Sequence, residues 1–510
     1  MEQLAKEGYE ARDRDFNTRL DVKDRVLDYL ESAFGPDTAQ RMIASGFPIY
    51  PYSVAFKKAG EPRIFTVTLD PSGLLLGWSC GFEDDDEGDS LDLEHARTIA
   101  LRAISDRLGM DTTTLAIKAA STKILDKRQD HYFTWERYLS FQPELREEMS
   151  VHLAGSRIAS ASRALIVPPA EARASRVKSA PRDALTAIGY ALIAAGSVIA
   201  FLFFLNRLND RDVLLGRVLA MAAVAFACLA GADLLRPSGY FLDWDPLQPK
   251  GISYAGTAVW NMAGYLQLMI LLLAFIGAGD AIDRREGSGR GESLWALCRG
   301  RLSDAKVAAA SMRGFLIGLC CGGVLTLSIS TIRWLTQGSV SIQPRGFFFY
   351  GINSTSPTFS ILLFFLFVAL TEELGYRFFG GAWLMKKTGN KFIAIALPAV
   401  IYGLAHTPFD FLPPAEPFWG RAVALTLVSC VWGWAFLRFD ALTVILSHYT
   451  ADLFIFNWPR LGSGRPELIA AAVATVAVPL LPAALLLIRT MSGGRHTRRI
   501  AVQPREGGHS

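Results

Sequence analysis

The pattern of hydrophobic and polar positions changes near residue 183. Up to Arg182 the sequence is rich in charge and its apolar stretches are short, whereas from Ala184 onward long apolar runs alternate with short polar loops. Runs of about 20 apolar residues are typical of helices that cross a membrane. The pattern predicts an all-α polytopic membrane protein, with about eight to nine transmembrane helices, preceded by a soluble α+β domain.

The predicted soluble domain covers residues 1–167. The elements expected are a helix over 22–34, a strand near 50–56, a hairpin over 64–80, a helix over 91–108, and strands over 116–125 and 131–141. Pro71 and Gly73 supply the hairpin turn, and Ser90 is a suitable N-cap for the second helix. The domain is similar in outline to the small PepSY-like modules of bacterial envelope proteins. We expect it to present substrate or to act as a tether.

Nine apolar runs are long enough to be spans, and the charge of their loops indicates orientation. The runs lie near 184–205, 218–235, 254–279, 315–332, 359–384, 392–407, 422–437, 441–457 and 468–488. The loop 280–314, the turn at 386–391 and the C-terminal tail are basic, so they belong on the cytoplasmic side. Nine spans would then put the N-terminal domain outside, although the basic segment before the first span favours the cytoplasm. A missing upstream anchor would reconcile the two and is preferred to a miscounted span.

Composition excludes several classes of function. Hydrophobic residues make up 51% of the 510 residues, and a net charge of +4 gives no bulk attraction to nucleic acid. The six cysteines show neither CxxC nor zinc-ribbon spacing, so we expect packing rather than a disulfide framework. The sequence also carries no GxSxG, P-loop or GxGxxG fingerprint.

Two adjacent glutamates, Glu372 and Glu373, lie in a stretch that is otherwise as apolar as a membrane span, and Arg377 follows four residues later. An ionised carboxylate at the centre of a membrane helix costs about 2.5–3.5 kcal/mol on the milder insertion scales. Such acids must face a polar cavity, pair with cations or hold a proton. An ionisable cluster inside a membrane is therefore a functional-site hypothesis.

The spacing of charges predicts that His406 lies beside Glu372. Lys386 follows Glu372 by 14 residues, or about 21 Å of helix, and His406 follows Lys391 by 15 residues. A helical hairpin that turns at 388–390 would place Glu372 and His406 at the same depth.

The span over 441–457 adds His448 and, one helical turn later, Asp452, so both share one helix face. His406 and His448 are the only histidines between residue 184 and the tail. Their placement with the acids favours a site over isolated packing residues.

Three motifs resemble those of the CPBP family, the CAAX-protease and bacteriocin-processing (Abi) intramembrane endopeptidases, which include the eukaryotic type II CAAX prenyl protease. The motifs are Glu372-Glu373-x-x-x-Arg377, Tyr402-x-x-x-His406 and His448-x-x-x-Asp452. They are similar to the family's EExxxR, FxxxH and HxxxN/D, with tyrosine in place of the usual phenylalanine.

The resemblance covers less than half of the chain and completes the division into domains. After the soluble domain over 1–167, the expected units are a basic linker over 168–183, accessory transmembrane helices with a cytoplasmic loop over 184–310, a CPBP/Abi-like catalytic domain over 311–490, and a basic cytoplasmic tail over 491–510.

The resemblance implies hydrolysis of a peptide bond by a glutamate-activated water. Glu372 would be the general base, and His406 would orient the water and share its proton. His448 and Asp452 would bracket the developing oxyanion.

Three further residues would support the site. Glu373 and Arg377 are spaced for an ion pair along the helix that holds Glu372 in place. Tyr402 would keep the aromatic body that the family has at this position. Since HExxH is absent, we expect no cofactor, and zinc bound by Glu372, His406 and His448 is the less favoured alternative.

Two other classes of function compete with the endopeptidase. One is a non-catalytic membrane scaffold or immunity-type protein of the same fold, and the other is a proton-coupled carrier. The expected partners are a membrane protein or peptide substrate and the lipid bilayer, with no nucleic acid. The expected location is the bacterial inner membrane, with the C-terminus in the cytoplasm.

Overall fold

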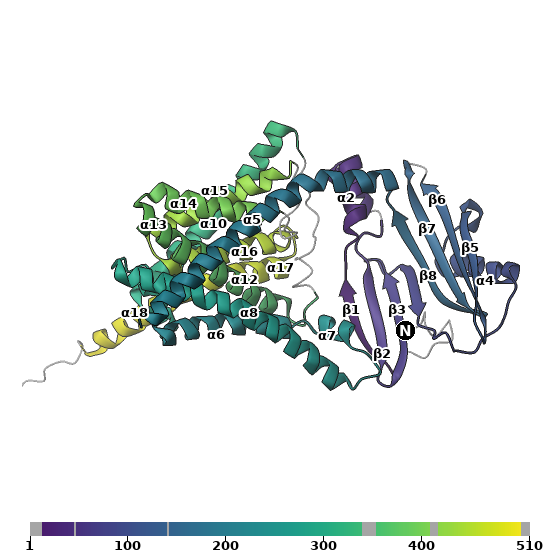
Figure 1. Ribbon diagram of the computed structural model, residues 1–510, viewed down its shortest axis with the longest axis horizontal. Coiled ribbons are helices and arrows are strands. Elements are labelled where there is room, and N and C mark those ends of the chain that lie inside the picture. Colours follow the sequence, from purple (N-terminus) through teal and green to yellow (C-terminus); the bar gives the residue numbers. More distant parts are fainter. Residues whose placement is uncertain (1–12, 45–46, 140–141, 339–352, 408–416, 501–510) are drawn as a thin grey trace, which may run out of the picture.

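The computed structural model consists of a β-sheet domain and a helical bundle, which stand end to end (Figure 1). It describes residues 13–44, 47–139, 142–338, 353–407 and 417–500. The first twelve residues of the predicted soluble domain and the last ten of the predicted tail lie outside the described residues. The predicted fold class, a helical membrane protein with an N-terminal α+β domain, is confirmed.

The N-terminal domain is one antiparallel sheet in the order β1-β2-β3-β4-β8-β7-β6-β5. The strands are β1 (Asp15–Leu20), β2 (Tyr52–Lys58), β3 (Glu61–Leu69), β4 (Leu75–Cys80), β5 (Ala116–Ile124), β6 (Gln129–Leu139), β7 (Gln142–Ala154) and β8 (Arg157–Ile166). The predicted hairpin is β3–β4, and its turn forms because Asp70 Oδ1 accepts hydrogen bonds from the amides of Ser72 and Leu74 while Gly73 adopts a φ of 89°. The final residues of the strand expected over 131–141 lie outside the described part of the chain.

Three helices cover the sheet: α2 (Asp24–Phe34), α3 (Pro36–Ala44) and α4 (Leu93–Asp106). The N-cap of α4 is Asp92, which accepts from the His95 amide at 2.9 Å, so the expected cap at Ser90 is wrong by two residues. β1, α3, β7 and β8 were not expected. β7 and β8 carry many charged or small residues, and the two-residue period of half-buried strands is hard to see in them.

The bundle contains all nine predicted spans as helices. They are built from α5 (Pro169–Asn209), α6 (Leu215–Leu234), α8 (Lys250–Arg285), α10 (Ala305–Thr336), α12 (Pro357–Glu373) with the π-helical segment η2 (Leu374–Gly381) and α13 (Ala382–Thr388), α14 (Lys391–Ala405), α15 (Trp419–Arg438), α16 (Ala441–Leu461), and α17 (Pro466–Ala477) with the 3₁₀ turn η3 (Val478–Leu480) and α18 (Leu481–Ile500). Two short helices, α7 (Pro237–Asp243) and α9 (Glu292–Cys298), lie between spans.

Seven helical stretches of the described chain are long and apolar enough to cross a membrane. α14 is shorter than these seven, and α16 is not among them. His448 and Asp452 are among the polar residues that lower the hydropathy of α16. The predicted linker over 168–183 is not a separate segment, because α5 begins at Pro169 and continues through Pro181.

The three basic segments meet at one end of the bundle. Lys386 pairs with Glu286 at 2.9 Å, and Arg489 donates to Ser303 Oγ at 3.1 Å, so the loop, the turn and the start of the tail lie together. The sheet domain stands at the opposite end (Figure 1). This arrangement is the one expected if each of the nine predicted spans runs from one end of the bundle to the other.

The sheet domain is attached to the bundle by specific contacts as well as by α5. The ammonium of Lys57 donates to the carbonyls of Phe241, Leu242 and Trp244 at 2.6–2.9 Å. At the edge strand, the side chain of Asn353 forms two 2.9 Å hydrogen bonds with the backbone of Leu20. These contacts fix one orientation of the domain over the end of the bundle.

Candidate active site

A helical hairpin places the motif residues at one depth, as their spacing predicts. α13 ends at Thr388 and is followed by Gly389, whose φ of 63° is the left-handed conformation common after a helix. Asn390 then caps α14 and accepts from the amides of Phe392 and Ile393. The chain therefore reverses at the predicted residues and runs back toward Glu372.

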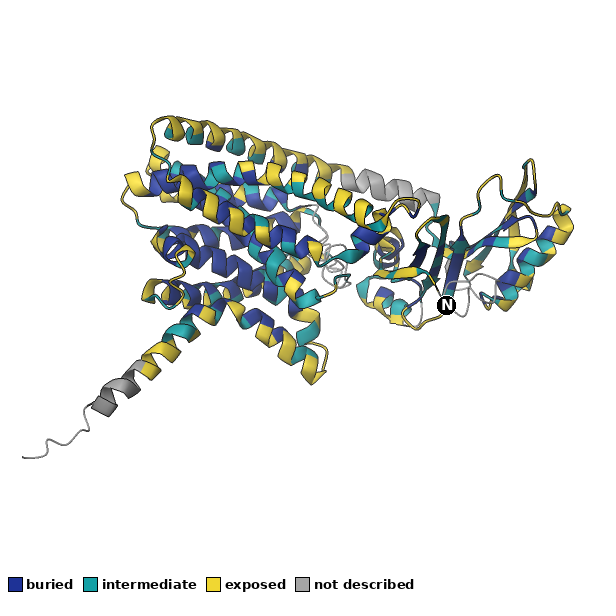
Figure 2. Ribbon diagram, turned by 90° about the horizontal axis from the view of Figure 1, so that it is seen from below, coloured by how far each residue is buried: buried dark blue, intermediate teal, exposed yellow. Residues whose placement is uncertain are grey.

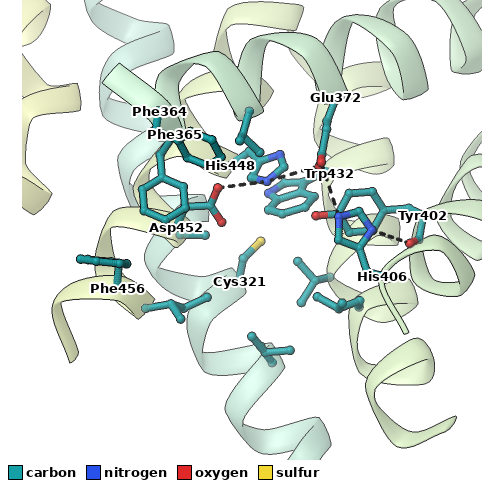
Figure 3. Close-up of a pocket in the computed structure, with 16 residues that line it drawn as sticks. Cys321, Phe364, Phe365, Glu372, Tyr402, His406, Trp432, His448, Asp452 and Phe456 are labelled. Carbon is teal, nitrogen blue, oxygen red and sulfur yellow. Dashed lines mark hydrogen bonds and ion pairs between the residues drawn. The ribbon is translucent and has the colours of Figure 1, made fainter. Parts of the chain in front are cut away.

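Glu372 lies between two histidines at the wall of a cavity (Figure 3). Its Oε1 is 3.4 Å from His406 Nε2, and its Oε2 is 3.8 Å from His448 Nε2. The side chain of Glu372 is 23% exposed, yet its Oε2 is buried and has no hydrogen-bond partner among the described residues. A buried carboxylate oxygen without a partner is rare in folded proteins, and such an atom can receive a hydrogen bond from a small polar molecule.

His406 is held with one nitrogen toward Glu372. Its Nδ1 is 2.8 Å from the carbonyl oxygen of Tyr402, and because a carbonyl only accepts, Nδ1 carries the proton. The ring also stacks on Tyr402 at 4.1 Å between centroids. Nε2 is thus left facing the carboxylate.

Glu373 makes different contacts from its neighbour. Its Oε1 accepts a hydrogen bond from Arg377 Nη1 at 2.9 Å and lies 2.8 Å from His448 Nδ1. The side chains of Glu373, Arg377 and His448 are 1%, 3% and 2% exposed. The predicted Glu373–Arg377 ion pair is present, and it also fixes the imidazole of His448.

His448 connects the two glutamates to Asp452. Its Nε2 is 3.4 Å from Asp452 Oδ2, so the i,i+4 spacing on α16 gives the side-by-side contact that the sequence implies. Figure 3 shows Asp452, His448, Glu372 and His406 in a row along the cavity wall. The structure thus brings all four predicted site residues together from three helices.

Residues of α15 complete the site and were not found from the sequence. Trp432 stacks on His448 at 4.2 Å between centroids and donates from Nε1 to Ser447 Oγ at 3.0 Å. The guanidinium of Arg377 donates to the hydroxyl of Ser429 and lies 5.3 Å from the ring centroid of Trp432. Neither Trp432 nor Ser429 belongs to a motif, and only the packing of α15 against η2 and α16 shows their place.

The helix departs from α geometry directly after the glutamates. Residues 374–381 form the π-helical segment η2, which carries Arg377 on its buried side. π-Helical turns are rare and occur frequently at functional sites. η2 packs closely on α8, where a side chain at Gly279 would meet Phe378 at 2.5 Å.

The cavity beside Glu372 has a volume of about 320 Å³. Apart from the site residues and Cys321, its walls are apolar, with Leu325, Phe364, Phe365 and Phe456 among them. Such a cavity suits an apolar segment whose polar backbone meets only the polar groups at its end.

The described residues do not form a ready metal site. No group of three or more His, Cys, Asp or Glu side chains within them is arranged to hold a metal ion. The zinc alternative needs Glu372, His406 and His448 each at about 2.0–2.2 Å from one ion. His448 can offer only Nε2, because its Nδ1 is bound to Glu373.

Comparison with known families gives one match. Residues 354–454 match the family described as type II CAAX prenyl endopeptidase Rce1-like. No curated protein and no solved structure matches the chain. The matched segment begins before α12 and ends within α16, so it contains all three motifs. The predicted family resemblance is thereby confirmed, and residues 354–454 form an Rce1-like domain of the CAAX-protease family.

Proposed function

We propose that the protein is an intramembrane endopeptidase that hydrolyses a peptide bond of a membrane-associated protein or peptide. The observation that carries this proposal is Oε2 of Glu372, which is buried at the cavity wall between His406 and His448 and has no hydrogen-bond partner in the described part of the chain. A water in the cavity that donates a hydrogen bond to this oxygen would be within reach of Glu372 acting as a general base.

In the proposed reaction, Glu372 takes a proton from the water as the water oxygen attacks the carbonyl carbon of the scissile bond. His406 orients the water through Nε2, because its Nδ1 proton is committed to the Tyr402 carbonyl. Breakdown of the tetrahedral intermediate breaks the C–N bond, and the proton passes from Glu372 to the leaving amine. Atoms and charge balance without a further reactant.

His448 is proposed to stabilise the oxyanion. With Glu373 accepting from Nδ1, a proton on Nε2 would point toward the space between Glu372 and Asp452. Charged donors fixed in a dry site are the strongest means of stabilising developing negative charge. Asp452 would hold this proton in place until the carbonyl oxygen arrives.

We propose that catalysis uses no metal, and zinc held by Glu372, His406 and His448 stays the alternative. If zinc were bound, it would polarise the carbonyl or activate the water. The sheet domain is proposed to lie on the outer face of a bacterial inner membrane, opposite the basic ends of the bundle. A membrane protein or peptide is the proposed substrate.

The test is cleavage of a membrane-peptide library by the purified full-length protein, with and without a zinc chelator. Glu372→Gln should lower cleavage by about 10²–10⁴-fold. Glu467→Gln, at an exposed glutamate on α17, is the matched control and should cleave like the wild type. Chelator-sensitive cleavage would restore the zinc alternative, and no cleavage by the wild type would favour the scaffold.

A further inference from the structure

A second apolar cavity meets the site from the other side. It has a volume of about 440 Å³ and lies between α5, η2, α13 and α14. Glu372 and His406 line this cavity as well as the first one. The pair therefore stands at the junction of two cavities.

The two cavities extend from Glu372 in opposite directions along the bundle. α12 runs from the sheet domain toward the basic end, so Phe364 marks the first, sheet-end cavity and Leu384 the second, basic-end cavity. At about 1.5 Å per residue, Phe364 lies about 12 Å before Glu372 and Leu384 about 18 Å after it. The two distances add up to roughly 30 Å, which is about the thickness of the hydrocarbon core of a membrane.

α5 forms the outer wall of the basic-end cavity and touches the bundle closely above and below it. At Gly189, a Cβ would lie 2.7 Å from the amide nitrogen of Ala405, and at Gly277 of α8, a Cβ would lie 2.5 Å from the ring of Phe204. Between these contacts, Ile193 and Gly196 line the cavity. Over Ala180–Asn209, the outer side of α5 is mostly exposed (Figure 2).

We propose that the basic-end cavity is a substrate subsite that receives apolar side chains on one side of the scissile bond, while the sheet-end cavity receives those on the other side. The substrate is then a transmembrane segment, locally unwound and cut in its interior. This proposal rests on the proposed function and adds the class of substrate. Its basis is that one carboxylate–histidine pair lines both cavities.

Physical chemistry requires the unwinding. In a helix each carbonyl is hydrogen-bonded and covered by side chains, so the water at Glu372 could not reach it. An extended chain rises about 3.3 Å per residue, so roughly nine residues would span both cavities. A substrate cut within three residues of its C-terminus would leave one cavity empty.

The test is a variant that places a larger side chain in the basic-end cavity from a residue in its wall. A Cβ at Gly196 would meet nothing within 4 Å, so the side chain of Gly196→Leu has room and takes up part of the cavity that Gly196 lines. Gly264→Leu on α8 is the matched control, since Gly264 is equally open and lines neither cavity. The substrates are synthetic apolar segments of roughly 20 residues, with large or small side chains on either flank of the cut.

Gly196→Leu should lower cleavage of peptides with large residues on one flank by about tenfold or more, and spare those with alanine there. Gly264→Leu should cleave both sets like the wild type. If wild type cleaves and Gly196→Leu has the control's profile, the cavity is a lipid-filled crevice and the proposal is wrong.

A second measurement separates this result from failure of the proposed function. Glu372→Gln protein is mixed with an apolar peptide that carries a benzophenone on each flank, and the crosslinked residues are identified by mass spectrometry. Crosslinks to Ile193 or Leu397 in the basic-end cavity support the subsite, even if the wild type cleaves nothing. Crosslinks confined to other surfaces overturn it.

Discussion

The two adjacent glutamates should respond in opposite ways to replacement. Glu373→Ala should destabilise the protein, whereas Glu372→Ala should leave stability nearly unchanged and abolish cleavage. The reason lies in their contacts. One oxygen of each carboxylate is buried without a hydrogen-bond partner among the described residues, but the other oxygen differs. Oε1 of Glu373, whose side chain is 1% exposed, contacts both Arg377 and His448, whereas Oε1 of Glu372, whose side chain is 23% exposed, lies 3.4 Å from His406.

The size of the stability loss expected for Glu373→Ala follows from the buried ion pair of Glu373 with Arg377. Arg377 Nη1 and His448 Nδ1 both meet Oε1 of Glu373, at 2.9 and 2.8 Å. Removing one partner of a buried ion pair costs about 3–5 kcal/mol, since the other charge stays buried. That loss corresponds to a fall in melting temperature on the order of 10 °C. For Glu372, loss of a partly exposed contact at 3.4 Å costs below about 1 kcal/mol.

The assay is thermal unfolding of the purified full-length variants in detergent, followed by tryptophan fluorescence, alongside peptide cleavage. Glu373→Gln is the graded control, because its amide oxygen can still accept from Arg377 and His448, so its melting temperature should lie between those of the wild type and Glu373→Ala. Equal losses of stability at both positions, or a larger loss for Glu372→Ala, would refute the assignment of separate roles.

Three further predictions concern other parts of the molecule. Burial raises the pKa of Asp130 in the sheet domain, but Arg128 and, to a smaller extent, His152 outweigh burial and lower that pKa from its ordinary value of 3.8. The stability that Asp130 contributes is therefore present above pH 3.8 and is lost as the pH falls through the lowered pKa. Thermal melts of Asp130→Asn should show a smaller loss of stability in acid than the wild type. Gly189→Val should force α5 away from Ala405, cost about 1–3 kcal/mol and reduce cleavage, as read from melting and turnover, and unchanged values would contradict the close contact. Lys57→Ala should loosen the sheet domain without altering its own fold, so hydrogen exchange should rise at α7, and an unchanged pattern would argue against the attachment.

The position of the sheet domain illustrates what charge counting alone leaves open. The basic residues before the first span favour the cytoplasm, while an odd number of spans favours the outside. In the structure that basic segment is the start of α5, at the end of the bundle away from the other basic segments. We therefore expect cysteine labelling from outside to reach the sheet domain and not the turn at 386–391.

The sequence by itself determined the fold class, the spans and the depth of the polar residues. Apolar runs of membrane length must form helices, because backbone groups in lipid have no other partner. Helix rise then converts residue spacing into depth, which is why the positions of Lys386 and Lys391 predict that Glu372 and His406 meet. The i,i+4 spacing of His448 and Asp452 gave their contact in the same way.

The i,i+4 spacing predicted the Glu373–Arg377 pair, but only the tertiary structure decided that this pair is buried against His448 while Glu372 lines the cavity. Adjacent residues on a helix point about 100° apart, and the rotation of α12 is set by its packing on α6 and α16, which no local pattern encodes. The same holds for Trp432 on α15 and for the cavity beneath α5, since both depend on helices distant in sequence. Spacing along one helix is a local property, whereas the facing of one helix toward another depends on the packing of all of them.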